Sequence, residues 1–382
     1  MMPANPSALT VGVLFSQTGV TAVVETTQRN AALIAIEEIN AAGGIKGREL
    51  RALAPDPASD PKRYGRAAED LLDQGVRVIF GCYMSSTRRA VLPRIERRDA
   101  LLFYPTLYEG FEYSPNCVYS GAAPNQNSLG LAHYLTTEID NRFFFVGSDY
   151  VFPYESNRIM RDLLLNRGAR VVDERYLPLK PDAEQIAKMI ALIRKHAPIT
   201  VFSTLVGDGV TAFYQAYDAA GFDRDVAPIA SLTTGEPELR AMGQAAAERH
   251  ITSAPYFSTL ERSENYHFVR RYREIHGTDA PISACTEAAY MQVHLFAEAA
   301  RRAETDDPAA ILAALPTFSF DAPQGSVRVD ARTSHTYLWP RVARVGPQGS
   351  FEIIREARAP VRPDPYMVEP EREDWGGEAA AR

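Results

Sequence analysis

The feature of this sequence that most restricts its fold is a regular alternation between short apolar runs and longer amphipathic segments. Each apolar run has the length of a buried strand, and the segments between the runs place apolar residues every three or four positions, as helices do. Strands that alternate with helices form a parallel sheet with right-handed crossovers. The first part of the chain therefore predicts an α/β fold with strands at 9–15, 50–54, 76–80 and 101–104.

The same order recurs further along the chain. A single hydrophobic core rarely grows beyond about 250–300 residues, and this chain has 382. We therefore expect two domains, each a doubly wound α/β unit. In the second unit strands are expected at 143–147, 169–176, 200–204, 227–232 and 251–256, with a helix at about 153–167. Two long helices are expected to follow, at about 263–275 and 284–302.

No low-complexity linker separates the two units, so ordered, extended segments must join them. We expect three such crossings, near residues 119–124, 253–257 and 321–327. One lobe would then contain residues 1–121 and 257–325, and the other residues 122–256 and 326–370. Four prolines after Ala359 predict a non-helical wrap over the surface, and residues 371–382 are interpreted as a polar, frayed tail.

The composition excludes several classes of protein. The 41 basic and 48 acidic residues give a formal net charge of −7, without the concentrated basic field that phosphate binding needs. Direct contact with nucleic acid is therefore not expected. The longest apolar stretches are no longer than a strand, so no membrane span is expected either. The oligomeric state is left open, and a homo-oligomer is one alternative.

The start of the chain bears on its location in the cell. Residues 1–8 lack the basic end, the apolar stretch and the small-residue cleavage site of a secretory signal. Cys82, Cys117 and Cys285 are an odd number of cysteines without close spacing, and we expect all three to be buried thiols. Both features favour a cytoplasmic protein. A periplasmic location would follow if a signal had been removed.

Signatures of catalysis and of cofactor binding are missing from the sequence. Gly207-Asp-Gly209 is a poor match to a dinucleotide fingerprint, and the seven histidines are scattered, so neither a cofactor nor a metal is expected. The paired carboxylates Asp56 and Asp60 are interpreted as turn and capping residues before a helix that begins at Pro61. The tyrosines described next have no activated nucleophile or base beside them, so we do not expect an enzyme.

Tyrosines are concentrated near the predicted ends of strands. Five of the eighteen lie between positions 83 and 119, with Tyr83 and Tyr104 at carboxyl ends in the first unit and Tyr150 at one in the second. Open α/β sheets bind ligands in the crevice beyond these ends. Ser85 would begin a helix there and present backbone N–H groups to the crevice. The spacing leaves a second interpretation open, in which Ser85 or Ser86 only caps the helix and the tyrosines pack between the lobes.

The side chains in this set carry no fixed charge. Tyrosine, serine and threonine offer neutral donors and acceptors between apolar walls, which suits a small, neutral, polar ligand. An amino acid would instead need one partner for its ammonium group and another for its carboxylate. Asp208 and Glu236, which follow strands of the second unit, keep an amino-acid ligand open.

Several short segments resemble one known family. On these residues the chain, from about Leu9 to Met367, resembles the aliphatic-amidase expression-regulating proteins, within the urea- and short-chain-amide-binding group of type I periplasmic binding proteins. The resemblance implies two doubly wound lobes joined by three crossovers, with the ligand between them. The matching segments include Gly81-Cys-Tyr-Met-Ser85, Tyr104-Pro-Thr106, Ala123-Pro-Asn-Gln-Asn127, Gly147-Ser-Asp-Tyr150, Asp321-Ala-Pro-Gln-Gly325 and Arg362-Pro-Asp-Pro-Tyr366.

The resemblance also implies a pocket for an amide. Backbone groups around Ser85 would pair with the C=O and NH₂ of the amide, and the hydroxyls of Thr106 and Tyr150 would complete its hydrogen bonds. Tyr83 and Tyr104 would close the apolar side around a short alkyl chain. A buried polar group left unpaired costs roughly 1–3 kcal/mol, so such a pocket can discriminate among small neutral ligands.

Three further residues complete the candidate ligand-binding set: Leu107, Gly207 and Thr233. Leu107 departs from the family, which has a proline after Tyr-Pro-Thr. The free N–H and the larger side chain of Leu107 leave the preferred alkyl length open.

The resemblance implies a regulatory function. The protein would be a cytoplasmic sensor of small aliphatic amides, such as acetamide, that controls amidase expression by sequestering an RNA-binding antitermination factor. A hinge of three crossovers suits this role, because a ligand that contacts both lobes favours closure. Two alternatives remain: the solute-binding component of a urea or short-chain-amide ABC transporter, and an amino-acid-binding protein.

Overall fold

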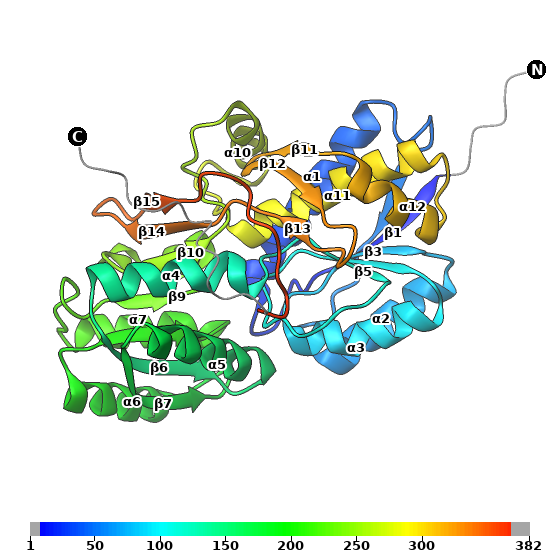
Figure 1. The fold of residues 1–382 in the computed structure, drawn as a ribbon. Helices are drawn as coiled ribbons and strands as arrows, with labels where there is room; N and C mark the ends of the chain where they lie inside the picture. Colours follow the sequence, from blue (N-terminus) through cyan, green and yellow to red (C-terminus); the bar gives the residue numbers. More distant parts are fainter. Residues whose placement is uncertain (1–7, 368–382) are drawn as a thin grey trace, which may run out of the picture.

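Two sheets, one in each half of the molecule, frame the computed structural model, which describes residues 8–367 (Figure 1). The first sheet has five parallel strands in the order β2-β1-β3-β4-β5. The strand order reverses between β1 and β3, and ligands of open α/β sheets bind beyond the carboxyl ends at such a point. The strands are β1 (Leu9–Leu14), β2 (Leu50–Leu53), β3 (Val78–Gly81), β4 (Leu101–Tyr104) and β5 (Cys117–Tyr119).

Helices cover both faces of this sheet. On one face α2 (Pro61–Asp73) and α3 (Ser85–Arg97) pack over the side chains of Ile79, Leu102 and their neighbours. On the other face α1 (Ala22–Ala41) packs against α11 (Ala284–Ala303), so a late segment completes the first lobe (Figure 1). The same core is joined by α10 (Ser263–His276), α12 (Pro308–Ala314) and η1 (Leu315–Thr317).

The second sheet is mixed, with the strand order β15-β14-β10-β9-β8-β6-β7. Its first five strands in the chain run parallel, and the last two, β14 and β15, pair antiparallel at one edge. The apolar run 143–146 is buried in β6, between β8 and the edge strand β7. The strands are β6 (Arg142–Ser148), β7 (Arg170–Leu177), β8 (Thr200–Thr204), β9 (Ile229–Ser231), β10 (Ile251–Ala254), β14 (Arg341–Val345) and β15 (Phe351–Glu356).

Two groups of helices enclose the second sheet. On one face lie α4 (Pro124–Glu138) and α5 (Val151–Asn166). The opposite face is covered by α6 (Ala183–His196), α7 (Asp208–Ala219), α8 (Glu236–Met242) and α9 (Gln244–Ala247). Doubly wound α/β architecture was predicted for both lobes, and it is confirmed.

A small third sheet corrects one predicted crossing. It is antiparallel and contains β11 (Phe320–Ala322), β12 (Gly325–Val329) and β13 (Thr336–Tyr337). The crossing predicted at 321–327 is therefore a hairpin, and a lobe boundary at 325/326 would cut β12. Val327 and Leu338 pack in the core of the first lobe, so the chain passes to the second sheet only between Leu338 and Arg341. The Pro-Gln-Gly sequence is a turn signal that fits a hairpin as well as an extended connection.

The other two passages between the sheets follow β5 and β10. Arg341 holds the hinge together, because its guanidinium donates to the backbone oxygens of Pro255, Gln324 and Trp339. Pro255 belongs to the second passage and Trp339 to the third, while Gln324 lies in the hairpin turn. One buried side chain thus links these three hinge segments.

Local signals predicted several details of the elements. Asp60 accepts a hydrogen bond from the N–H of Arg63 and caps α2, which begins at Pro61 as expected. The helix expected from residue 153 begins two residues earlier, at Val151. Cys82 and Cys117 are buried, as predicted, but Cys285 is only half-buried. The predicted polar tail, 371–382, lies outside the described residues.

The described part of the chain after residue 359 contains no helix. Val361 forms a β-bridge with Leu338, and the backbone oxygen of Pro365 accepts a hydrogen bond from Phe111. This segment therefore crosses from the second sheet back over the first lobe.

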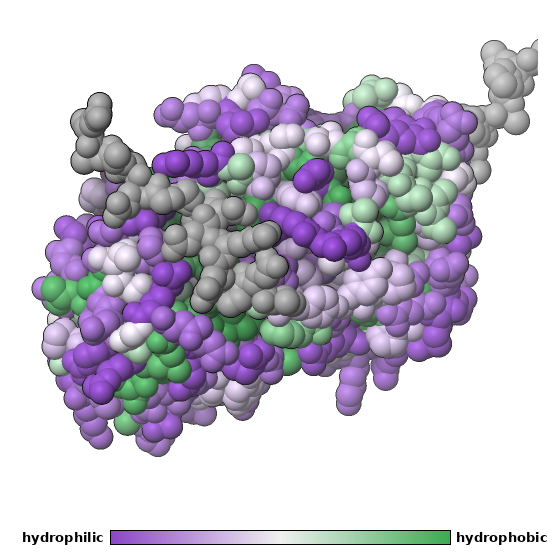
Figure 2. All heavy atoms as spheres, in the orientation of Figure 1, coloured by the Kyte–Doolittle hydropathy of each residue, from purple (hydrophilic) through white to green (hydrophobic). Residues whose placement is uncertain are grey.

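The visible surface is mainly hydrophilic, and its apolar residues form small groups (Figure 2). Over residues 8–367 we find no helix whose length and apolar content would let it cross a membrane. The same range contains no group of three or more histidine, cysteine or acidic side chains placed to hold a metal ion.

Candidate ligand-binding cleft

The predicted crevice residues lie at the carboxyl ends of strands from both lobes. In the first lobe, Tyr83 follows β3 directly before α3, and Thr106 follows β4. In the second lobe, Tyr150 lies between β6 and α5, Gly207 lies between β8 and α7, and Thr233 follows β9. The two sheets therefore present their carboxyl ends to each other across the lobe interface.

Between these ends lies a small pocket of about 210 Å³, which we call the interlobe pocket. Six of the eight candidate residues line it, together with Phe152 and Val206. None of its lining side chains is charged. The six candidates in the wall are Tyr83, Ser85, Thr106, Leu107, Tyr150 and Thr233.

Tyr104 does not line the interlobe pocket. It is fully buried beneath α3, where its ring lies 4.7 Å from the guanidinium carbon of Arg88. Its hydroxyl donates a 2.7 Å hydrogen bond to the backbone oxygen of Tyr83. Tyr104 points to the same face of the sheet as Leu102, because side chains alternate along a strand. Tyr104 therefore supports the backbone of Tyr83 and, contrary to the prediction, does not line the apolar side of the pocket.

Gly207 is also absent from the pocket wall, and it serves the contact between the lobes. Its φ of +66° and ψ of −148° belong to a region that is essentially restricted to glycine. A Cβ atom at this position would come within 2.5 Å of the backbone oxygen of Val20, in the opposite lobe. The absence of a side chain allows the two lobes to approach here.

The hydroxyl of Ser85 is engaged inside the first lobe. It donates to the carboxylate of Glu109 and accepts a 3.2 Å hydrogen bond from Nη1 of Arg88. Met84, not Ser85, is the N-cap residue, so Ser85 is the first residue of α3. The first N–H groups of a helix have no acceptor within the helix. The backbone N–H of Ser85 is one of these groups, while its hydroxyl is already engaged.

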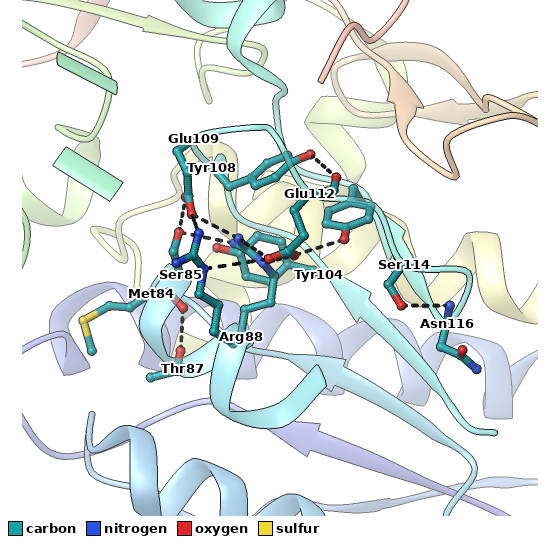
Figure 3. Close-up of polar contacts among 12 residues, drawn as sticks. Met84, Ser85, Thr87, Arg88, Tyr104, Tyr108, Glu109, Glu112, Ser114 and Asn116 are labelled. Carbon is teal, nitrogen blue, oxygen red and sulfur yellow. Dashed lines mark hydrogen bonds and ion pairs between the residues drawn. The ribbon is translucent and has the colours of Figure 1, made fainter. Parts of the chain in front are cut away.

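A buried ionic network lies behind Ser85 (Figure 3). The guanidinium of Arg88, which has no exposed surface, contacts Glu109 at 3.3 Å and Glu112 at 2.7 Å. It also lies between the rings of Tyr104 and Tyr108. Burial opposes ionisation of Glu112, but Arg88 outweighs it and the pKa of Glu112 is lowered. The network fastens the segment after β4, which contains Thr106 and Leu107, to the first turn of α3.

The two threonines in the wall are held by backbone groups. The hydroxyl of Thr106 is 3.3 Å from the backbone oxygen of Cys82 and accepts a 3.2 Å hydrogen bond from Nε2 of Gln28. The hydroxyl of Thr233 donates to the backbone oxygen of Leu205 at 2.7 Å. Both oxygens keep a lone pair that can accept a hydrogen bond from a ligand.

A larger space adjoins the interlobe pocket. This hinge-side cavity, which together with adjoining open solvent has a volume of about 680 Å³, shares Tyr83, Leu107 and Thr233 with the pocket. Its other walls come from the crossing segments 120–122 and 252–257, and from residues 282–288 at the start of α11. Glu236 and Glu238 of α8 complete its lining.

The acidic residues of the second lobe differ in their partners. Asp208 is exposed at the start of α7. Glu236 accepts hydrogen bonds from the N–H of Ile282 at 2.9 Å and from the hydroxyl of Ser258, and lies 3.8 Å from Arg273. Glu238 accepts a 2.8 Å hydrogen bond from the N–H of Gly235, and burial raises its pKa to about 7.

Glu238, Arg88 and Glu109 were not recognised as site residues from the sequence. Glu238, at the third position of α8, can accept a hydrogen bond from the N–H of Gly235 as in one half of a capping box, but this local signal does not reveal its burial in a cavity. The pairing of Arg88 with Glu109 depends on how the segment after β4 folds back on α3.

The profile of a family described as "Periplasmic binding protein domain" matches residues 9–372. The chain belongs to the periplasmic binding protein domain family. Its lobes have the type I fold of that family, as expected. The name of the family describes binding of a solute, not catalysis.

Curated relatives of this family member align mostly over short segments. A leucine-, isoleucine-, valine-, threonine- and alanine-binding protein of Pseudomonas aeruginosa is 35% identical over 89 residues, 23% of this chain and 24% of the relative. A protein named limonene hydroxylase from Geobacillus stearothermophilus is 26% identical over 127 residues, 33% of this chain and 23% of that protein. The chain thus spans about a quarter of the length of these relatives.

Longer matches have lower identity. A Leu/Ile/Val-binding protein homologue of Brucella melitensis is 21% identical over 326 residues, 80% of this chain and 83% of the relative. A solved structure of an ABC-transporter solute-binding protein from Rhodopseudomonas palustris, with 3,4-dihydroxybenzoic acid, has a TM-score of 0.83 at 19% identity and covers 93% of this chain and 98% of that one. These matches establish the fold and are not specific to the amide-regulating branch.

Proposed function

We propose that this chain is a solute-binding protein that takes a small, neutral amide or urea into the interlobe pocket. The observation that supports this ligand class is the pocket wall, whose eight residues carry hydroxyl and apolar groups and no charge. The backbone N–H of Ser85 would donate to the carbonyl oxygen of the ligand. The hydroxyl oxygens of Thr106 and Thr233 would accept from its NH₂ group.

The relatives support a solute-binding role, but the chemistry of the wall favours a different solute. Two of the relatives above are named for amino acids, and two similar solved structures contain benzoates, so each of these ligands carries a carboxylate. A buried carboxylate is costly unless it is paired with a cation or several donors. The wall of the interlobe pocket offers no basic side chain.

Calorimetric titration of the purified chain tests the ligand class. We expect heat of binding from acetamide or urea, and none from leucine or 4-hydroxybenzoate at the same concentrations. If only leucine or the benzoate produced heat, the amide proposal would be wrong and the ligand class of the relatives would apply.

A second proposal concerns what the bound state controls. The chain resembles the amide-sensing regulators, and a net charge of −7 suits a basic, RNA-binding partner. In an importer, a membrane permease would instead bind the closed form of the protein. The two roles also differ in location, cytoplasmic for the regulator and periplasmic for the importer component.

Affinity capture on the immobilised chain, with and without acetamide, separates these roles. Recovery of an RNA-binding protein in only one ligand state would support the regulatory role. If acetamide binds but neither state captures such a protein, the importer role is favoured.

A further inference from the structure

We propose that the hinge-side cavity receives the rest of a ligand whose amide or urea end lies in the interlobe pocket, and that Glu238 binds an ammonium group on that part of the ligand. This inference rests on the proposed function, because it assumes that the amide end occupies the interlobe pocket. It names the ligand class more closely: an amide with a short aliphatic chain that ends in an amine.

The first argument is that the two spaces adjoin. Tyr83, Leu107 and Thr233 line both, so a ligand held in the interlobe pocket lies next to the cavity and is separated from it by at most these three side chains. The cavity is lined by residues from both lobes and from the crossing segments.

The second argument is that the cavity is mostly apolar. Leu107, Tyr256, Phe257, Ile282 and Phe351 line it with hydrophobic surface. Each CH₂ group that moves from water into such surroundings strengthens binding about fourfold. A chain of several methylene groups therefore suits the middle of the cavity.

The third argument is the state of Glu238. Its side chain lines the cavity and is almost fully buried, and within residues 8–367 no ion pair is formed with it. The titratable groups that lie near it are the hydroxyls of Tyr83 and Tyr214 and the thiol of Cys285, which supply no positive charge. Without a cation beside it, burial raises the pKa of this carboxyl to about 7, so about half of it is protonated at neutral pH and its charged form is destabilised. An ammonium group on the ligand would supply the missing partner.

Glu236 cannot serve in the same way, although it lines the same cavity. Its carboxylate is already occupied by the N–H of Ile282, the hydroxyl of Ser258 and the guanidinium of Arg273. These partners belong to segments that follow β10 and precede α11, so Glu236 joins the second lobe to the first. Of the two acidic residues of α8, Glu236 thus joins the lobes, and Glu238 remains available to a ligand.

The structural role of Glu238 can be separated from the proposed one. Its carboxylate accepts a hydrogen bond from the N–H of Gly235 as in one half of a capping box, and glutamine at the same position can make that bond. Glu238→Gln therefore removes the charge and keeps the cap. Glu238→Asp keeps the charge on a shorter side chain.

The test is calorimetric titration of the full chain with acetamide and with two matched pairs of ligands: butanamide against 4-aminobutanamide, and hexanamide against 6-aminohexanamide. In at least one pair we expect the amino-amide to bind at least tenfold more tightly to the wild type than its plain counterpart. Glu238→Gln should reduce this ratio to about one, and Glu238→Asp should retain part of it. Asp208→Asn, which changes an exposed carboxylate outside the cavity, should keep the wild-type ratio.

The outcomes distinguish the inference from the proposed function. If acetamide binds but neither amino-amide is preferred, the inference is wrong and the proposed function stands. A preference that survives in Glu238→Gln, with thermal unfolding unchanged from the wild type, would also overturn the role of Glu238. If no amide binds at all, the proposed function itself fails.

Discussion

Ser85 donates its hydroxyl proton to the carboxylate of Glu109, while Arg88 contacts both residues. The side-chain oxygen that a motif search would assign to the ligand is thus occupied by the protein. Under the proposed function, the ligand would contact the backbone at this position, and the side chain would fix the geometry of that backbone. Several measurable consequences follow from this and from four other contacts.

Two substitutions at Ser85 separate the contribution of its backbone N–H to ligand binding from that of its side chain. Ser85→Ala keeps the N–H, so we expect the amide dissociation constant to rise by less than about threefold. Ser85→Pro removes the N–H at the first helical position, where proline is tolerated, and the extended backbone of Met84 is compatible with a following proline. We expect Ser85→Pro to weaken binding by a further tenfold or more in calorimetric titration. Equal affinities in the two variants would place the ligand contact elsewhere.

Replacement of Arg88 should destabilise the first lobe. Arg88→Met leaves Glu109 and Glu112 buried without their cation, and removal of one partner of a buried ion pair costs about 3–5 kcal/mol. Urea denaturation monitored by circular dichroism measures this loss. Arg97→Met is the matched control, because Arg97 belongs to the same helix but is exposed, and its variant should unfold like the wild type.

Gly207→Ala should hold the lobes apart. The added Cβ would collide with the backbone oxygen of Val20, so we expect amide affinity to fall at least tenfold and the radius of gyration in X-ray scattering to increase. Gly221→Ala is the control for backbone strain alone. Gly221 has a similar φ of +70°, but its Cβ would meet nothing within 4 Å. The same loss of affinity in both variants would argue against a lobe contact at Gly207.

Tyr150→Phe should weaken amide binding if the hydroxyl completes the hydrogen bonds of the ligand. Loss of one buried hydrogen bond costs about 1–3 kcal/mol, which corresponds to roughly fivefold to hundredfold in affinity. Tyr154→Phe removes the hydroxyl of an exposed tyrosine that bonds to Asp149, and it should leave the affinity unchanged. Unchanged affinity in Tyr150→Phe would remove Tyr150 from the site.

Stability should fall in mild acid because of His250. This side chain is buried and accepts a 2.9 Å hydrogen bond from the N–H of Ile229, and burial, reinforced by Arg224, lowers its pKa from 6.5 to about 3. Below pH 6.5 the unfolded chain therefore binds a proton that the folded chain excludes. The contribution of His250 is complete above pH 6.5 and decreases by about 1.4 kcal/mol per pH unit as the pH falls toward 3.

The measurement compares urea denaturation of the wild type and His250→Asn between pH 5 and pH 7. Asparagine retains a hydrogen-bond acceptor but does not titrate in this range. We expect a shallower dependence of the unfolding free energy on pH in the variant. The same slope in both proteins would exclude His250 as the cause.

The parts of the fold that could be predicted are those with a local signal. The alternation of strands and helices, the proline after Asp60 and the position of Thr106 beyond a strand can all be recognised within a few neighbouring residues. Tyr104 was predicted to close the apolar side of the pocket, but that prediction did not take into account that side chains alternate along a strand. The ring of Tyr104 lies on the same face of the sheet as Leu102, under α3. The hairpin at 320–329 was missed because one turn signal fits two different connections.

Sequence periodicity by itself determined that this protein has two doubly wound sheets and that neutral hydroxyl groups lie beyond their strands, because period and strand length are properties of neighbouring residues. Only the tertiary structure decided what those groups can do. The engagement of Ser85 by Glu109, the approach of Gly207 to Val20 and the burial of Glu238 in a cavity each join residues from separate segments. Such pairings depend on how the lobes pack, and no short stretch of sequence contains them.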